Sequence, residues 1–271
     1  MRFLDFADRV LSPVLLFVAV YLSALIPLAW VGFPLVQWAA LISVTIATVV
    51  TIVWVEKGRW DLGLFTTPFV ALRDFVSGSV VGIVLVGLCA LLVVLSTDLS
   101  HERGTGFPWV ELVTIFIPAA LHEELLFRGY PFQKILRWNR AAAILLVAAV
   151  FSALHGGNEA VSWIGLTNIF LGGVLLGLAY EMHYRLWFPI GIHLAWNLMT
   201  GPILGHEVSG YAGMQTLFVE TGGGPTFLTG GDFGIEGSIW MTLAELIGIV
   251  FLMTRRSRRG QASVVGEGGR S

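Results

Sequence analysis

Residues 78–96 read GSVVGIVLVGLCALLVVLS and contain no charged side chain. An apolar run of about 18 or more residues is long enough to cross the hydrocarbon core of a bilayer as one helix. We interpret this stretch as a transmembrane helix, and it decides the class of fold.

Further apolar stretches lie on both sides of this one. They are found at 10–30, 34–55, 109–127, 141–156, 163–182, 187–204 and 238–254. The chain is 56% hydrophobic and 13% charged, with a mean hydropathy of +0.80, whereas soluble domains are about 25% charged. Eight spans of about 20 residues use most of the chain. The sequence therefore predicts an all-α, polytopic membrane helix bundle in which 1–271 form a single integral membrane domain.

The basic residues predict how this bundle is oriented. With eight spans and the N-terminus inside, 15 of the 16 lysines and arginines fall on the cytoplasmic side, and only Arg103 falls outside. Cytoplasmic loops carry such an excess, so we expect a multi-pass protein of the cell membrane with both termini in the cytoplasm. The basic run 255–259 is expected to contact anionic lipid rather than nucleic acid. The connection 56–77 mixes basic with apolar residues, which favours a position along the membrane interface.

Ionisable side chains inside the predicted spans are few, and each is a candidate for function because burying it in a membrane is costly. Those that we select as candidates are His122, Glu123, Glu124, Arg128, His155, His193 (with Asn197 nearby) and Glu245. Glu124 and Arg128 are four residues apart and can form an ion pair on one helix face, which leaves Glu123 free on another. We interpret His122 as an exposed bystander, and no partner for Glu245 is apparent.

Other catalytic patterns fail on inspection. A zincin helix needs a second histidine four residues after His122, and Leu126 stands there. Ser152 lacks the flanking glycines of a nucleophile elbow. The single cysteine, Cys89, is expected to be an apolar filler. The glycines at 172, 173 and 177 are explained by close helix packing.

Three short motifs on separate spans resemble a known family. They are EELLFR at 123–128, FSALH at 151–155 and HLAWN at 193–197. These match the EExxxR, FxxxH and HxxxN motifs of the CAAX-protease and bacteriocin-processing (CPBP) family, in the family's order. The runs 177–197 and 224–238 are also similar to bacterial members. The resemblance covers 105–240, which we expect to be the catalytic core region.

The resemblance implies an intramembrane endopeptidase related to type II CAAX proteases. Glu123 and His155 would activate a water molecule, His193 and Asn197 would bind the oxyanion, and Arg128 would hold Glu124 in place. Phe151 lies one helical turn before His155 and is expected to pack against its ring. The expected substrates are membrane-associated peptides, such as a prenylated CAAX tail or a bacteriocin leader, with membrane lipid as the other partner and no role for nucleic acid. The alternatives are an inactive immunity or scaffold protein of the same fold and a proton-coupled transporter.

A metal is left open at this point. Glu123, Glu124, His155 and His193 could supply three ligands to a catalytic Zn²⁺, the set Glu123, His155 and His193 being the simplest. Because the same residues suffice to activate water directly, and the two-histidine helix is missing, metal-free chemistry is favoured.

A shared site requires Glu123 and His155 to lie at the same membrane depth. We expect the helix that carries Glu123 to continue through Pro131 to about Trp138 and the chain to turn near Asn139. Each residue is then 16 positions from the turn (139 − 123 and 155 − 139), or about 24 Å at about 1.5 Å per residue.

Overall fold

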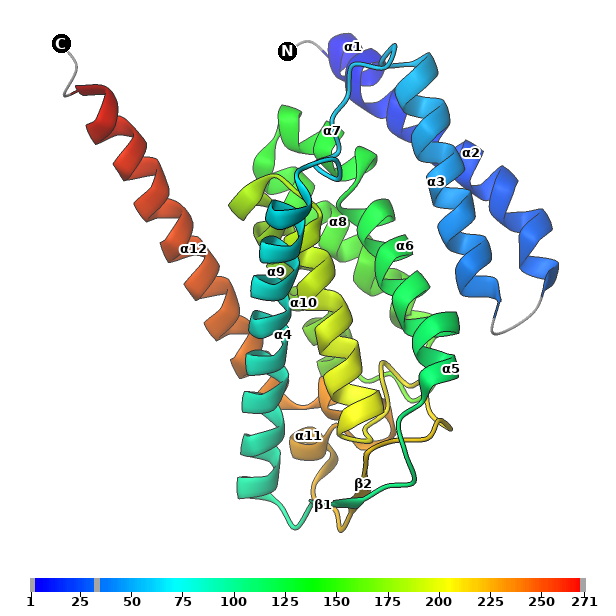
Figure 1. The fold of residues 1–271 in the computed structure, drawn as a ribbon, viewed down its shortest axis with the longest axis vertical. Coiled ribbons are helices and arrows are strands. Elements are labelled where there is room, and N and C mark those ends of the chain that lie inside the picture. Colours follow the sequence, from blue (N-terminus) through cyan, green and yellow to red (C-terminus); the bar gives the residue numbers. More distant parts are fainter. Residues whose placement is uncertain (1–2, 32–34, 269–271) are drawn as a thin grey trace.

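The computed structural model describes residues 3–31 and 35–268, with side chains over 5–30 and 35–255. The described chain is an all-α helix bundle with a small cap at one end (Figure 1). Its helices are α1 Phe3–Phe6, η1 Ala7–Leu11, α2 Ser12–Leu28, η2 Ala29–Val31, α3 Val36–Trp54, α4 Pro68–Ser96, α5 Trp109–Glu111, η3 Leu112–Phe116, α6 Ile117–Phe127, α7 Tyr130–Trp138, α8 Arg140–Leu154, η4 His155–Gly157, α9 Trp163–His183, α10 Trp187–Leu198, η5 Met199–Ile203, α11 Thr226–Thr229, η6 Gly231–Phe233, η7 Ile235–Gly237 and α12 Ile239–Gly268.

Among the described residues, five helical segments are long and apolar enough to cross a membrane: Ala7–Leu28, Val36–Trp54, Pro68–Ser96, Arg140–Gly157 and Trp163–His183. This confirms the predicted class of fold. The other three predicted spans are helical too, but 109–127 carries three glutamates, α10 has 12 residues, and the side chains of α12 are described only as far as Arg255. The number eight therefore stays a prediction.

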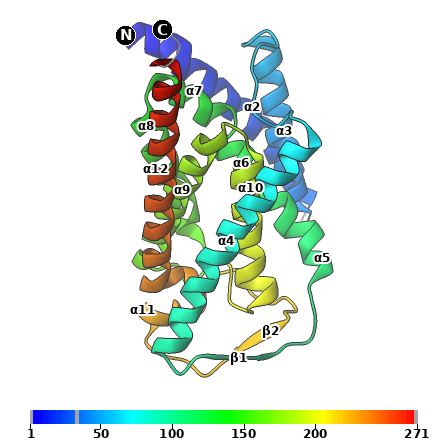
Figure 2. The same ribbon diagram turned by 60° about the vertical axis from the view of Figure 1, so that its left-hand side comes forward.

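The cap lies at the opposite end from α1 and from the C-terminal end of α12 (Figure 2). It contains the antiparallel pair β1 Ser100–Arg103 and β2 Phe218–Thr221, in which Ser100 faces Thr221. The short helices α11, η6 and η7 complete it. These glycine-rich segments close the bundle beneath α4 and α10.

Glycines bring α4 and α10 into backbone contact. A Cβ added at Gly78 would lie 2.1 Å from the Phe188 carbonyl oxygen, and one at Gly82 would lie 2.5 Å from that of Ile192. From the other side, a Cβ at Gly191 would lie 2.2 Å from the Phe75 carbonyl oxygen. Small residues four apart permit such close packing of membrane helices. The Gly78/Gly82 pair, which we did not single out in the sequence, fixes the helix that carries His193.

The expected continuous helix from Glu123 to Trp138 is wrong. α6 ends at Phe127 and α7 begins at Tyr130, with Gly129 between them. A Cβ at Gly129 would lie 2.0 Å from the Leu125 carbonyl oxygen, and Pro131 occupies the first turn of α7, where its missing N–H costs nothing. The turn near Asn139 is present, and the Asn139 side chain caps α8 by accepting a hydrogen bond from the Ala142 amide.

The interfacial connection is shorter than expected. α4 begins at Pro68, with Thr67 as its N-cap, so 68–77 belong to a membrane-spanning helix. Only the segment between α3 and α4 remains as a connection, and it buries Trp60 while leaving Phe65 90% exposed. The apolar character of 68–77 therefore reflects a longer span.

Candidate active site

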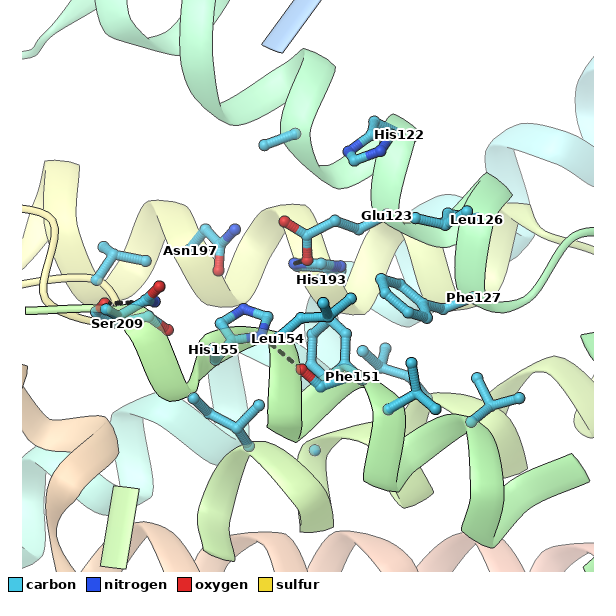
Figure 3. A pocket seen from close by; sticks show the side chains of 18 of the residues that line it. His122, Glu123, Leu126, Phe127, Phe151, Leu154, His155, His193, Asn197 and Ser209 are labelled. Atoms are coloured by element: carbon cyan, nitrogen blue, oxygen red, sulfur yellow. Dashed lines mark hydrogen bonds and ion pairs between the residues drawn. The ribbon is translucent and has the colours of Figure 1, made fainter. Parts of the chain in front are cut away.

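The described residues line a large cavity of about 1250 Å³ within the bundle. Its walls are mostly apolar and come mainly from α2, α6, α8, α9 and α10, with further residues from α3, η3, α7, α12 and the cap. Side chains of Glu123, His155, His193 and Asn197 all line it, and Figure 3 shows them directed toward a common space. The four residues come from α6, η4 and α10.

The two adjacent glutamates have different surroundings. Glu124 is fully buried, and its Oε1 accepts hydrogen bonds from Arg128 Nη1 at 3.0 Å and from His193 Nδ1 at 2.8 Å. Arg128, 1% exposed, also donates from Nη2 to the Gly173 carbonyl at 3.1 Å. Glu123 keeps 22% of its side chain exposed and faces the cavity. Glu124 is thus committed to structure, whereas Glu123 is available to a ligand.

His193 connects these two carboxylates. Its Nδ1 is held by Glu124, and its Nε2 lies 3.7 Å from Glu123 Oε2. When Nε2 carries a proton as well, the ring is cationic, and the two carboxylates together with Arg128⁺ leave this buried group with no net charge. Nε2 is then a hydrogen-bond donor directed at the cavity.

The His155 ring is held in one orientation and one tautomer. Its Nδ1 lies 2.7 Å from the Phe151 carbonyl oxygen, which can only accept, so in the neutral ring Nδ1 bears the proton and Nε2 carries the lone pair. The Phe151 ring packs on the His155 ring at 4.5 Å between centroids, as the one-turn spacing predicted. Phe151 also contacts the Arg128 guanidinium, 5.1 Å from its ring centre. The aromatic side chain therefore links the buried ion pair to the histidine.

Asn197 follows His193 by one helical turn and presents its amide to the same space (Figure 3). It makes no hydrogen bond with any other described residue. The His193 ring and the Asn197 amide are two donors on one face of α10.

The interpretation of His122 as an exposed bystander is wrong. Its Nε2 lies 2.8 Å from the Tyr21 hydroxyl, the two rings stack at 5.8 Å, and its Nδ1 is buried without a hydrogen-bond partner among the described residues. Both residues line the cavity. Tyr21 belongs to α2, so the N-terminal hairpin of α2 and α3 forms a wall next to Glu123.

Glu236, in the short helix η7 of the cap, is a buried residue that lines the cavity. Its Oε1 accepts from Trp196 Nε1 at 2.7 Å, and its Oε2 accepts from the Ser209 amide at 2.5 Å and hydroxyl at 2.8 Å. The carboxylate thereby ties the cap to α10, close to His193 and Asn197.

The donor types suit zinc, but their placement does not. His155 and His193 each have Nδ1 held by an acceptor, which leaves Nε2 for a metal, as in many zinc sites. Nevertheless, the described residues contain no group of three histidine, cysteine, aspartate or glutamate side chains positioned to hold a metal ion. We therefore derive no step through a metal.

A family model matches the segment of the chain that carries these residues. Residues 105–199 match the family model described as type II CAAX prenyl endopeptidase Rce1-like. The matched segment is therefore similar to that family. The Rce1-like segment runs from the loop before α5 to the end of α10 and includes all three motifs, which confirms the resemblance inferred from them.

The curated proteins contain a more distant relative. The UPF0177 protein YvdC of Lactococcus lactis subsp. lactis (strain IL1403) is 29% identical over 101 residues, which is 37% of this chain and 38% of the relative. The alignment thus spans well under half of either protein. No solved structure matches the chain.

Proposed function

We propose that the protein is an intramembrane endopeptidase that cleaves membrane-associated peptides with a water molecule activated by Glu123 and His155. The observation that carries this proposal is the convergence of Glu123, His155, His193 and Asn197 on one cavity within a helical membrane bundle. The Rce1-like family of the segment supports the same reaction class.

The reaction begins with a water molecule between Glu123 and the lone pair of His155 Nε2. Glu123 takes a proton from the water, and the water oxygen bonds to the carbonyl carbon of the peptide. The electron pair of the C=O double bond moves to its oxygen, which accepts hydrogen bonds from His193 Nε2 and Asn197. When this intermediate collapses, the C–N bond breaks, and the proton held by Glu123 passes to the departing amine.

The remaining residues position these groups. Glu124 fixes the His193 ring, Arg128 neutralises Glu124, and Phe151 fixes the His155 ring. Removing Glu123 or His155 should therefore abolish turnover, whereas changes at Glu124 or Arg128 should weaken it.

A non-catalytic scaffold would not need this arrangement, because the His155 lone pair and the Asn197 amide make no hydrogen bond within the described structure. A proton-coupled transporter also uses buried carboxylates and histidines, but it predicts inverted repeats and broken helices in both halves of the chain. The residues of the candidate site instead come from one stretch of the sequence, between Glu123 and Asn197.

The proposal is tested by comparing membrane-protein N-termini in cells that express wild type, Glu123→Gln, His155→Ala or Glu102→Gln. Glu102 is an exposed residue of β1 and serves as the matched control. New N-termini should form with wild type and Glu102→Gln and be absent with the other two variants, given equal insertion in the membrane. The same N-termini with Glu123→Gln would refute the mechanism, and none with wild type would favour the scaffold.

A further inference from the structure

Glu245 is a buried carboxyl group that the proposed mechanism does not use. It lies on α12, is 2% exposed, and lines the same cavity as Glu123. Its Oε1 faces α9 at Gly172, where an added Cβ would lie 3.1 Å away. The absence of a side chain at position 172 leaves the carboxyl open to the cavity.

No described residue satisfies this carboxyl group. It makes no hydrogen bond to any of them, and its Oε2 is fully buried without a partner. An unpaired carboxylate inside a membrane bundle costs several kcal/mol. A neutral, protonated carboxyl would also leave its O–H donor without an acceptor, which is costly too.

The neighbouring polar groups are already engaged. Glu236 accepts three hydrogen bonds from Trp196 and Ser209. Asn168 donates to the carbonyls of Glu236 and Ser238, and its Oδ1 accepts from Thr242. Arg128 is paired with Glu124. Glu236 and Glu245 thus both place carboxyl groups at the cavity, and no cation of the described chain forms an ion pair with either.

The shape of this region selects among possible occupants. A divalent cation needs about six oxygen ligands, and the single unsatisfied carboxyl falls far short of that. The wall of the same cavity includes the apolar side chains of Leu175, Leu176 and Ile192 and the Trp196 ring. Such walls suit the methylene stem of a lysine or arginine side chain, whose charged end could then reach Glu245.

We propose that Glu245 forms a subsite for a basic side chain of a peptide ligand. The ammonium or guanidinium group would donate hydrogen bonds to the Glu245 carboxylate, while the stem lies on the apolar wall. Taking this ligand to be the substrate rests on the proposed function, and the inference then restricts the substrates to peptides with a basic residue inside the membrane-embedded stretch.

The test measures binding, so that it does not depend on turnover. The probes are fluorescent 20-residue leucine–alanine peptides in lipid nanodiscs, with one lysine at each of five successive positions, and matched peptides with norleucine, which has the same stem without the charge. The proteins are wild type, Glu245→Gln, Gly172→Ala and the exposed control Glu102→Gln.

At one or two positions, lysine should improve binding to wild type and Glu102→Gln on the order of tenfold over norleucine, as expected for one charged hydrogen bond. Glu245→Gln should remove this preference. Gly172→Ala should reduce it, because the new methyl group crowds Oε1 without changing any charge. The norleucine peptides are the control for folding. They should bind all four proteins equally if neither Glu245→Gln nor Gly172→Ala disturbs the fold or the cavity.

Equal binding of lysine and norleucine peptides to wild type at every position would overturn the inference, as would a lysine preference that survives Glu245→Gln or a failure of every peptide to bind. A lysine preference in a protein that releases no new N-termini would instead overturn the proposed function alone. Peptide cleavage by a protein that shows no lysine preference would overturn the Glu245 subsite and leave the proposed function standing.

Discussion

The Arg128 guanidinium is buried away from water, and its ion pair with Glu124 is the most costly interaction of the site to break. Breaking a buried pair leaves one charge uncompensated, which costs about 3–5 kcal/mol. An exposed pair contributes about 0–1 kcal/mol. The chain also offers a less buried pair for comparison, because Arg73, which pairs with the buried Asp74, is itself 53% exposed.

We therefore expect Arg128→Ala and Glu124→Gln to lower the thermal stability of the solubilised protein strongly and to reduce hydrolysis. Arg73→Ala should change neither, since Asp74 keeps Arg185 at 2.6 Å. The double variant Glu124→Gln/Arg128→Met should recover part of the lost stability but not the rate, because His193 loses its support. Melting curves measure the change in stability, and initial rates measure the change in hydrolysis. Equal losses of stability for Arg73→Ala and Arg128→Ala would contradict this account.

The placement of the histidines and glutamates also predicts the metal content of the protein. We expect the purified active protein to contain no tightly held zinc, because its histidines and glutamates are not placed as a three-ligand set. Elemental analysis together with rates before and after dialysis against a chelator checks this. One zinc per active chain, lost together with activity, would show that Glu123, His155 and His193 bind it.

The sequence predicted the residues that belong to local motifs and missed those that do not. Spacing within a helix indicated the Glu124–Arg128 pair and the packing of Phe151 on His155. Tyr21 and His122 are 101 positions apart, and Trp196 and Glu236 are 40 apart. No pattern in a single sequence links such residues, because the contacts arise only when separate helices assemble.

At the level of elements, the contact between α4 and α10 allows a matched test on one helix. Gly82→Ala would place a methyl group 2.5 Å from the Ile192 carbonyl oxygen, whereas Gly87→Ala meets nothing within 4 Å. We expect Gly82→Ala to destabilise the protein and to reduce activity by displacing His193. Gly87→Ala should be neutral or stabilising by up to about 1 kcal/mol, since alanine favours the helix. Similar melting temperatures for the two variants would argue against the backbone contact.

The segment between α3 and α4 is anchored to α7 by Glu56. Its Oε1 accepts from Lys134 Nζ and from the Tyr130 hydroxyl, both at 2.6 Å. Burial alone would raise the pKa of the Glu56 carboxyl, but these hydrogen bonds outweigh it and hold the pKa below its ordinary value of 4.5. The anchor is therefore ionised at neutral pH.

A folded-state pKa below the unfolded one adds stability that is complete above the ordinary pKa and is lost as the pH falls through the folded value. The difference in melting temperature between wild type and Glu56→Gln should therefore be constant near neutral pH and shrink once the pH drops below 4.5. Taking the difference removes acid effects shared by both proteins. A gap that stays constant into strong acid would show that the Glu56 charge contributes nothing.

Element boundaries were predictable where apolar runs end at polar residues, as at α8 and α9. The break between α6 and α7 was missed because the helix was expected to continue through Pro131. Gly129, two residues earlier, is the position at which the chain leaves one helix and begins the next.

For the whole molecule, α1, α7 and the C-terminal end of α12 lie at one end of the bundle and β1 lies at the other (Figure 1). Ion pairs at the first end join Lys134 to Glu56 and Arg140 to Glu181, while Arg103 belongs to β1. This arrangement supports the proposal that the basic end faces the cytoplasm. The predicted lipid contacts of 255–259 fall mostly outside the residues whose side chains are described.

Reporter fusions test this orientation. A fusion after Ser100 should report an external position, and one at Ser271 a cytoplasmic position, because an excess of lysine and arginine marks the inner side. A control fusion after Arg59 should also be cytoplasmic. An external signal from the Arg59 or Ser271 fusion would reverse the topology.

The cavity draws its walls from beyond the Rce1-like segment, since Tyr21 lies on α2 and Glu245 on α12, whereas the groups assigned to the chemistry all lie between Glu123 and Asn197. Selection can therefore act separately on the residues of the outer helices that line the cavity and on the residues that carry out the reaction. Over evolutionary time, the outer helices could change to admit new peptides while the reaction stays the same. A chimera that takes its first and last helices from a relative should accordingly inherit the donor's preference for substrates and keep the recipient's chemistry.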